Sequence, residues 1–433
     1  MAAKGKGGRR DGALASSAAS LPAPPPAFAV PDDVLRFLLE RLSPAELVRA
    51  ALVCRGWQRV ASYLAAARPP PHLGYIFHPC DTPPPPPIEE TSRGNYPAVF
   101  VPVDAAAPRL SLHFAAADAY RGFGIYEVHH GLVLLLLFSR PEALVPRILV
   151  RDPASRRRAL LPSPPRDAVP DDKWRRDRKV IGVAVLSRAH PSRLSFEAVC
   201  LTIDAARPRA WVASVRDGAC TWRALPRSRN VKINFDPKWF EHRCVHAAGD
   251  IYWHICNSGR ALKLDPRTLE FSFLLAPAQL GDSYAKYRIG ETPEDGSLCI
   301  GSAEDEEFQL WVREEADHSD NGWMMVRRVS LHSVYNSVPR LPMDSVSRLI
   351  STWLSDIDAG RTGKVFIKMQ GYGRYSFHMD TRKLERLETD DGKEYGNPIY
   401  AYCLAWPPAF LAPKDVDGLS GRKRTLEKGH RCP

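Results

Sequence analysis

His242, Cys244 and His246 alternate near the middle of the chain, and they are the side chains best suited to metal chemistry. Alternate residues of a strand point to the same face, so these imidazole and thiol groups would gather on one side. Cys256 is a conceivable fourth ligand. A structural zinc site needs four ligands at tetrahedral geometry, however, and this spacing matches no known zinc motif. We therefore predict no metal ion and no cofactor.

The remaining reactive residues predict no catalytic site. His129 and His130 are neighbours, so in a strand they would point to opposite faces and not share a metal. The acidic run Glu304 to Glu307 is typical of a solvated loop, because catalytic carboxylates need separate environments. Arg121-Gly-Phe-Gly lacks the third glycine of a dinucleotide loop. With no Gly-x-Ser-x-Gly motif and no Cys/His nucleophile arrangement, we predict a protein that is not an enzyme.

The cysteine pattern and the hydropathy of the chain indicate the cellular environment for which the protein is suited. Nine cysteines occur singly and never as Cys-x-x-Cys, which favours reduced intracellular thiols over disulfides or a zinc module. The longest apolar run, Leu132 to Phe138, is far shorter than the roughly 20 residues that span a bilayer, and it predicts a buried strand. We expect no membrane association.

The net charge of +11 is concentrated at the two ends of the chain. Residues 1–30 and residues 412–433 each carry +3, so the long body between them carries only about +5. Nucleic-acid binding is therefore the last-ranked function. The basic runs Lys4 to Arg10 and Arg422 to Arg424 are solvated ends or nuclear import signals, and we expect a nuclear or cytoplasmic protein.

The elements that carry function begin with the segment Val30 to Trp57. Asp32 and Asp33 follow Pro31, and apolar residues then recur at helical spacing as far as Leu42. Ser43-Pro44-Ala45-Glu46 predicts an N-cap, a proline at the first helical position and a capping box for a second helix that runs toward Trp57. This segment is too short to bury its own apolar side, so either the rest of the chain or another protein covers it.

The order Pro-Asp-Asp-x-Leu, Leu-Leu-x-x-Leu, Ser-Pro-x-x-Leu and Val-Cys-x-x-Trp resembles the F-box. That family docks on a Skp-type adaptor and through it on the cullin of a ubiquitin ligase. This chain has Val30-Pro31 where the family more often has Leu-Pro. The resemblance implies a set of adaptor-binding positions that serve partly as core and partly as docking edge: Pro31, Leu35, Leu38, Leu39, Leu42, Pro44, Leu47, Val48, Val53, Cys54 and Trp57.

We predict five regions along the chain. Residues 1–29 form a disordered basic, Ala/Pro-rich tail, and residues 30–67 form the F-box with a short third helix. Residues 68–90 form a proline-rich linker whose five consecutive prolines, Pro83 to Pro87, would hold two bodies apart in polyproline II geometry. Residues 91–411 form an all-β domain, and residues 412–433 form a basic disordered tail.

The all-β domain shows an internal repeat. One element is a glycine followed by an apolar strand, at Gly131, Gly249, Gly296 and Gly363, with a weaker copy at Val180. The other is a tight turn near Asp152, Asp217, Asp265, Asn321 and Asp380, which recurs every 48 to 65 residues. This period predicts a kelch-like β-propeller, with a sixth blade completed by residues 91–118 and by Ile399 to Trp406 from the other end. A β-sandwich or an unclosed set of sheets is the alternative.

The phrases HHGLVLLL, VRDPASRRRALLP and AAGDIYWHICNSGRALKLDPRTLEFSFLLAP resemble the F-box-associated β-propellers of large plant F-box families. The resemblance implies a non-catalytic substrate receptor of a Skp–cullin–F-box ubiquitin ligase, with an unknown target protein on the propeller. Two alternatives stay open: an F-box scaffold that acts outside the ligase, and a propeller that binds a small molecule or sugar. Trp211, Trp222, Trp253, Trp311, Trp323 and Trp353 are expected mostly in the core, with one or two available to anchor a partner.

Overall fold

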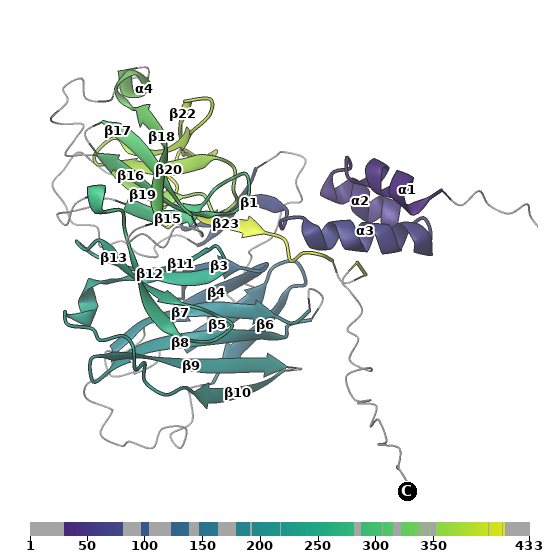
Figure 1. Ribbon diagram of the computed structural model, residues 1–433, viewed down its shortest axis with the longest axis horizontal. Coiled ribbons are helices and arrows are strands. Elements are labelled where there is room, and N and C mark those ends of the chain that lie inside the picture. The colour runs from purple at the N-terminus through teal and green to yellow at the C-terminus, as the bar shows by residue number, and fades with distance from the viewer. Residues whose placement is uncertain are drawn as a thin grey trace, which may run out of the picture. The chain divides into compact units, whose positions relative to one another are not determined.

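The structure, a computed structural model, divides the chain into two units, residues 1–64 and residues 65–433 (Figure 1). It describes residues 30–80, 97–103, 123–137, 147–162, 179–190, 193–280, 287–336 and 352–411, and the single positions 338, 341 and 346. Within these ranges, positions 217, 305, 315–321, 337, 397 and 409 are not described. The predicted tails 1–29 and 412–433 lie outside the described residues. No helix among the described residues is long and apolar enough to cross a membrane.

The first unit is helical, with α1 (Asp32–Leu39), α2 (Pro44–Ala51) and the start of α3 (Arg55–Ala67). The predicted capping box is confirmed: the Glu46 backbone N–H donates to Ser43 Oγ, and Glu46 Oε2 accepts from the Ser43 backbone N–H at 2.9 Å. The second helix is shorter than predicted. It ends at Ala51, so Cys54 precedes α3 and Trp57 lies on α3.

The second unit is a ring of six antiparallel sheets, as the sequence period predicted. Five sheets have four strands in sequence order, which makes five complete blades. Their first strands are β3 (Gly124–His129), β7 (Lys179–Arg188), β11 (Phe240–Ala247), β15 (Tyr287–Glu291) and β19 (Thr352–Ile357). Their second strands are β4 (Leu132–Leu137), β8 (Phe196–Asp204), β12 (Asp250–Ile255), β16 (Leu298–Glu304) and β20 (Lys364–Met369).

The outer half of each blade completes the pattern. The third strands are β5 (Arg147–Asp152), β9 (Arg207–Arg216), β13 (Arg260–Leu264), β17 (Glu307–Arg313) and β21 (Gly373–His378). The fourth strands are β6 (Arg157–Leu161), β10 (Ala219–Ala224), β14 (Phe271–Leu275), β18 (Trp323–Ser330) and β22 (Leu384–Arg386). First strands of different blades approach one another, which places them around the axis of the ring. The short helix α4 (His332–Asn336) follows β18.

The repeat that was read from the sequence corresponds to fixed places in the blades. The strands after Gly131, Gly249, Gly296 and Gly363 are the second strands of their blades. The turns near Asp152, Asp217, Asp265, Asn321 and Asp380 all fall between third and fourth strands. The copy at Val180 was placed wrongly, because it lies in β7, a first strand.

The sixth blade joins the two ends of the propeller. It has the order β2–β1–β23, in which β1 (His72–Phe77) pairs with β2 (Val99–Pro102) on one side and with β23 (Tyr400–Cys403) on the other. The predicted closure by the C-terminal segment is therefore confirmed. Ile76 and Phe77 are fully buried, and the Tyr75 hydroxyl donates to Asp358 Oδ2 at 2.8 Å, just past the end of β19. The strand β1 thus ties the closing blade to its neighbour.

The structure corrects the predicted linker 68–90 and the predicted start of the propeller at residue 91. Strand β1 lies within that linker and forms the middle of the closing blade. Along the chain, the run Pro83 to Pro87 comes between β1 and β2, two strands of the same sheet. It is outside the described residues, but it connects parts of one domain and does not separate the two units. The linker was predicted wrongly because a proline-rich composition indicates a loop but does not show whether that loop lies between two domains or within one.

Candidate functional site

Helix α1 is apolar on two sides, although only one side can pack within its own unit. Leu35 and Leu39 are buried, whereas Val34, Phe37 and Leu38 are exposed. Phe37 is 57% exposed and Leu38 is 49% exposed. Phe37 and Leu38 follow Val34 at i+3 and i+4, so the three side chains form one exposed stripe, which we call the α1 face. An apolar stripe that the unit's own core does not cover is suited to a partner.

A second apolar site follows α2. Leu52 and Val53 are 70% and 66% exposed, at the corner where α2 ends and before α3 begins. Tyr63 on α3 is also exposed. Single exposed apolar residues are common on protein surfaces, but two in succession at a corner, in a unit with an unpaired helix face, indicate a larger binding surface.

Basic side chains border these apolar residues. The Arg41 guanidinium lies 3.5 Å from the centre of the Phe37 ring, and Arg36 lies 5.3 Å from the centre of the Tyr63 ring. Arg59 pairs with Asp32 at 2.6 Å, and both side chains are exposed. Arg36 also pairs with Glu40 at 2.8 Å, so the charges of Arg36 and Arg59 are balanced within the unit, and Arg41 is the cation of the three best placed to attract an acidic partner toward the apolar stripe.

The eleven residues implied by the F-box resemblance fall into three groups in the structure. Leu35, Leu39 and Leu47 are core residues of the helical unit. Pro31, Leu38, Val53 and Cys54 are exposed. Leu42, Pro44, Val48 and Trp57 are partly exposed. The predicted set therefore contains both buried core residues and exposed residues, as expected. The role of each residue in adaptor binding stays a prediction.

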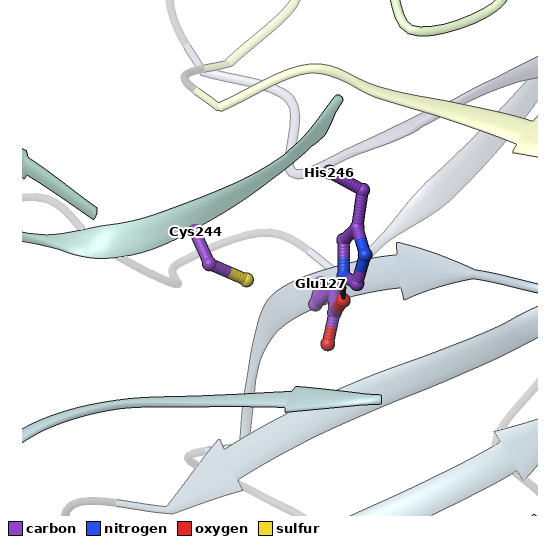
Figure 2. A group of neighbouring side chains, drawn as sticks. All are labelled: Glu127, Cys244 and His246. Atoms are coloured by element: carbon purple, nitrogen blue, oxygen red, sulfur yellow. Dashed lines mark hydrogen bonds and ion pairs between the residues drawn. The ribbon is translucent and has the colours of Figure 1, made fainter. Parts of the chain in front are cut away.

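A second polar site lies in the propeller, where two first strands approach each other. The Glu127 side chain from β3 meets Cys244 and His246 from β11, and their ligand-type atoms lie within 4.8 Å of one another (Figure 2). Glu127 Oε1 contacts His246 Nε2, and Glu127 Oε2 accepts from the Val185 backbone N–H at 2.7 Å. Burial and the neighbouring Glu127 carboxylate raise the pKa of the Cys244 thiol. Cys244 and His246 were predicted to share a face, but Glu127 is 119 residues away in the chain and was missed.

The two neighbouring histidines depart from the prediction. His130 has a positive φ of 50° at the turn after β3, so it does not continue the alternation of the strand. The rings of His129 and His130 instead lie 3.9 Å apart between centroids, and His129 stacks on His246 at 3.6 Å. The expectation of opposite faces was wrong because the strand ends at His129. Burial and the nearby His246 and His130 rings lower the pKa of His129.

Other charged groups of the first strands pair with one another. Arg243 on β11 pairs with Asp356 on β19, and Arg288 on β15 pairs with Glu241 on β11 at 3.3 Å. The Arg288 Nε–H also donates to the Ser355 backbone carbonyl at 2.9 Å. A small-molecule site would show a convergent set of polar groups, and such a set is present, but these members neutralise each other.

His254 on β12 is a buried histidine with a strongly perturbed pKa. The Ile289 backbone N–H donates to His254 Nε2 at 3.4 Å, which requires a neutral ring with Nε2 as acceptor. Burial lowers the pKa of His254 to about 3, with the Arg288 and Arg243 cations acting in the same direction against Glu241. The ring is therefore neutral in the folded chain throughout the physiological range.

We expect acid to destabilise the propeller through this residue. The unfolded chain takes up the His254 proton near pH 6.5, while the folded chain resists it down to about pH 3, so stability falls as the pH drops through that window. Between pH 7 and pH 5 the loss from His254 alone should be about 2 kcal/mol. Urea unfolding followed by tryptophan fluorescence checks this. Between pH 7 and pH 5, the unfolding free energy of His254→Gln should fall by about 2 kcal/mol less than that of the wild type. The exposed control His332→Gln should lose as much unfolding free energy as the wild type. Equal losses in all three proteins would contradict the assignment.

The tryptophans divide as the sequence suggested. Trp211, Trp253 and Trp311 are buried. Trp222 and Trp323, each on a fourth strand, donate their indole N–H groups to the backbone carbonyls of Pro162 and Leu275, at 2.9 Å in both cases. Trp353 is 47% exposed. It is the member of the predicted set best placed to meet a partner.

Comparison with known protein families decides what the two units are. A family model described as "F-box protein AT5G49610-like, beta-propeller" matches residues 124–410, which is more than half of the chain. An F-box-like model matches residues 28–65. This chain belongs to the AT5G49610-like F-box protein family. Its helical unit is an F-box-like domain, and its second unit is the six-bladed propeller of the family. The narrower assignment to the kelch type stays a prediction.

Comparisons with individual proteins add little to the family. A search of curated proteins found no match. The Cps50 (Swd1) β-propeller domain of Myceliophteria thermophila is 13% identical, with 59% of this chain and 69% of that chain covered, at a TM-score of 0.31. AztD from Citrobacter koseri is 12% identical, with 70% and 64% covered, at 0.29. A putative 6-phosphogluconolactonase from Bacteroides uniformis is 10% identical, with 76% and 98% covered, at 0.34. At this level of similarity none of the three bears on function.

Three exposed apolar side chains of the F-box-like unit, Val34, Phe37 and Leu52, were absent from the predicted adaptor-binding set. The signal for Val34 and Phe37 was in the sequence, because Phe37 and Leu38 follow Val34 at i+3 and i+4. Leu35 and Leu39 have the same spacing, so spacing alone did not separate the exposed side of the helix from the buried side.

Proposed function

We propose that this chain is the substrate-recognition subunit of a Skp–cullin–F-box ubiquitin ligase. The F-box-like unit binds a Skp-type adaptor and through it a cullin, while the propeller binds a target protein that is thereby ubiquitinated and degraded. The chain itself performs no bond chemistry. It raises the local concentration of target lysines near the ubiquitin-loaded enzyme. A nuclear or cytoplasmic location is part of this proposal.

The exposed α1 face is the observation that supports the proposal best. Val34, Phe37 and Leu38 lie on one side of a two-turn helix and are 45%, 57% and 49% exposed. Covering each of them is therefore worth about half of the roughly 1.5–3 kcal/mol that full burial of such a side chain contributes. The core of the F-box-like unit is already filled by the other side of α1, so rearrangement within the unit would not cover this stripe. A partner with an apolar groove, bordered by an acidic group that matches Arg41, would cover it.

The propeller supports the other half of the proposal. Its blades form a closed ring that includes both ends of the domain, so it presents a rigid surface for a target. The exposed indoles of Trp239 and Trp353 are the side chains there with the greatest capacity to anchor a protein, since tryptophan dominates many interfaces.

Affinity purification of the full chain and of Leu38→Asp from cells with blocked proteasomes tests the proposal. The wild type should capture adaptor, cullin and at least one further protein that accumulates when degradation is blocked. Leu38→Asp should keep that further protein and lose adaptor and cullin together. Adaptor without cullin would favour a scaffold that acts outside the ligase, and absence of adaptor from the wild-type sample would contradict the proposal.

A further inference from the structure

The cluster of Glu127, Cys244 and His246 is unusual among the described residues. It is the one group there of three or more Cys, His, Asp or Glu side chains whose ligand atoms lie within 4.8 Å of one another. The Glu127 and Cys244 side chains are almost fully buried, and the His246 side chain is 20% exposed. The three atoms come from β3 and β11, which belong to different blades. The three side chains therefore come together only when the blades close into a ring, and no local sequence motif contains all three.

We propose that Glu127, Cys244 and His246 bind one divalent metal ion of the zinc class. Ligand atoms that sit about 2.0–2.3 Å from a zinc ion lie less than about 5 Å from each other, and the observed separations meet that condition. Carboxylate oxygen, thiolate sulfur and imidazole nitrogen are the donor types that zinc takes in proteins. One carboxylate and one thiolate also balance the double charge of the ion, which a buried site requires.

The surroundings hold Glu127 and His246 in place. Glu127 Oε2 is fixed by the Val185 backbone N–H, which leaves Oε1 toward His246 and Cys244. His129 stacks on the His246 ring and limits its rotation. Strand β3 has a register shift between Ile125 and Glu127, and β11 has one between Phe240 and Cys244. Such bulges re-aim side chains, and here both occur next to a ligand.

Three protein ligands leave a fourth tetrahedral position open. Structural zinc sites are closed by four protein ligands, whereas sites with three keep a place for water or for a donor atom of another molecule. His246 is the one partly exposed ligand of the three, so solvent can reach the cluster beside its ring. The ion would also link two blades and so stabilise the folded ring. This inference does not depend on the ligase proposal.

Titration of the metal-free full chain with Co²⁺ and Zn²⁺ tests the site. Co²⁺ should bind at one equivalent with a thiolate-to-cobalt charge-transfer band, and Zn²⁺ should displace it and raise the unfolding temperature. Cys244→Ser should lose the band, and His246→Ala should weaken Co²⁺ binding at least tenfold. Cys256→Ser removes an exposed thiol outside the cluster and should behave as wild type.

Two results would overturn the proposal. One is a wild-type chain that shows no thiolate band at a saturating Co²⁺ concentration. The other is a band that persists in Cys244→Ser or disappears in Cys256→Ser. Circular dichroism of each metal-free variant shows whether it is folded. If His246→Ala fails that check, Cys244→Ser decides the question, since serine differs from cysteine by a single atom and leaves the Glu127 contacts in place.

Discussion

A chain that starts at residue 91 is expected to lose the cooperative propeller fold, whereas a chain that starts at residue 65 is expected to keep it. The shorter chain lacks β1, the middle strand of the closing blade. Both β2 and β23 pair with β1, so both lose their partner strand. It also lacks Tyr75, Ile76 and Phe77, which are all buried. Phe77 stacks on Tyr395 with 3.9 Å between ring centroids, and Tyr75 donates to Asp358.

The loss of β1 should cost as much free energy as the net stability of a typical domain. Burial of the three side chains is worth about 2–3 kcal/mol each, and the hydrogen bonds of two strand pairs are lost as well. Net stabilities of domains are roughly 5–15 kcal/mol. Urea unfolding and size-exclusion chromatography of residues 65–411 and 91–411 measure the outcome. A monomeric 91–411 chain with the same unfolding midpoint as 65–411 would show that β1 is not part of the ring.

Leu38→Asp is expected to abolish adaptor binding and to leave the fold unchanged. The Leu38 side chain is 49% exposed on the α1 face, so its aspartate replacement stays hydrated in the free chain. At a covered interface the same carboxylate would be desolvated without a partner, which costs several kcal/mol. We expect the affinity to fall at least a hundredfold. Leu38→Met keeps the apolar character and should bind like wild type.

Leu39→Asp is the matched contrast, because it makes the same chemical change one residue further along the helix. Leu39 is 1% exposed and packs in the core of the F-box-like unit, so the aspartate would unfold that unit. Circular dichroism and limited proteolysis should show the loss of helix in Leu39→Asp and intact helix in Leu38→Asp. If Leu38→Asp also unfolds, the α1 face is core and not a docking surface.

The sequence was most informative where local chemistry repeats. The capping box at Ser43 and Glu46 depends on residues three apart. The turns at Asp152 and Asp265 depend on an Asp before Pro, whose carboxylate accepts from the backbone N–H two residues on. Both could be read directly because every contact that defines them is local. The six-bladed ring followed from the spacing of those turns.

The sequence was least informative where distant segments meet. His72 to Phe77 looked like part of a linker because the prolines beyond it dominate the local composition, while its partner strand lies more than 300 residues away in the chain. Glu127 could not be linked with Cys244 and His246 for the same reason. Likewise, helical spacing marks both sides of α1 as apolar and does not reveal which side is buried.

The most direct test of the account is the binding of the purified Skp-type adaptor to the full-length chain, measured by isothermal titration calorimetry. We predict saturable one-to-one binding by the wild type and by Leu38→Met. We predict no detectable binding by Leu38→Asp at the same concentrations, with an unchanged circular dichroism spectrum. Binding by Leu38→Asp that equals the wild type, or no binding by the wild type, would contradict the assignment of the α1 face as the surface that joins this chain to a ubiquitin ligase.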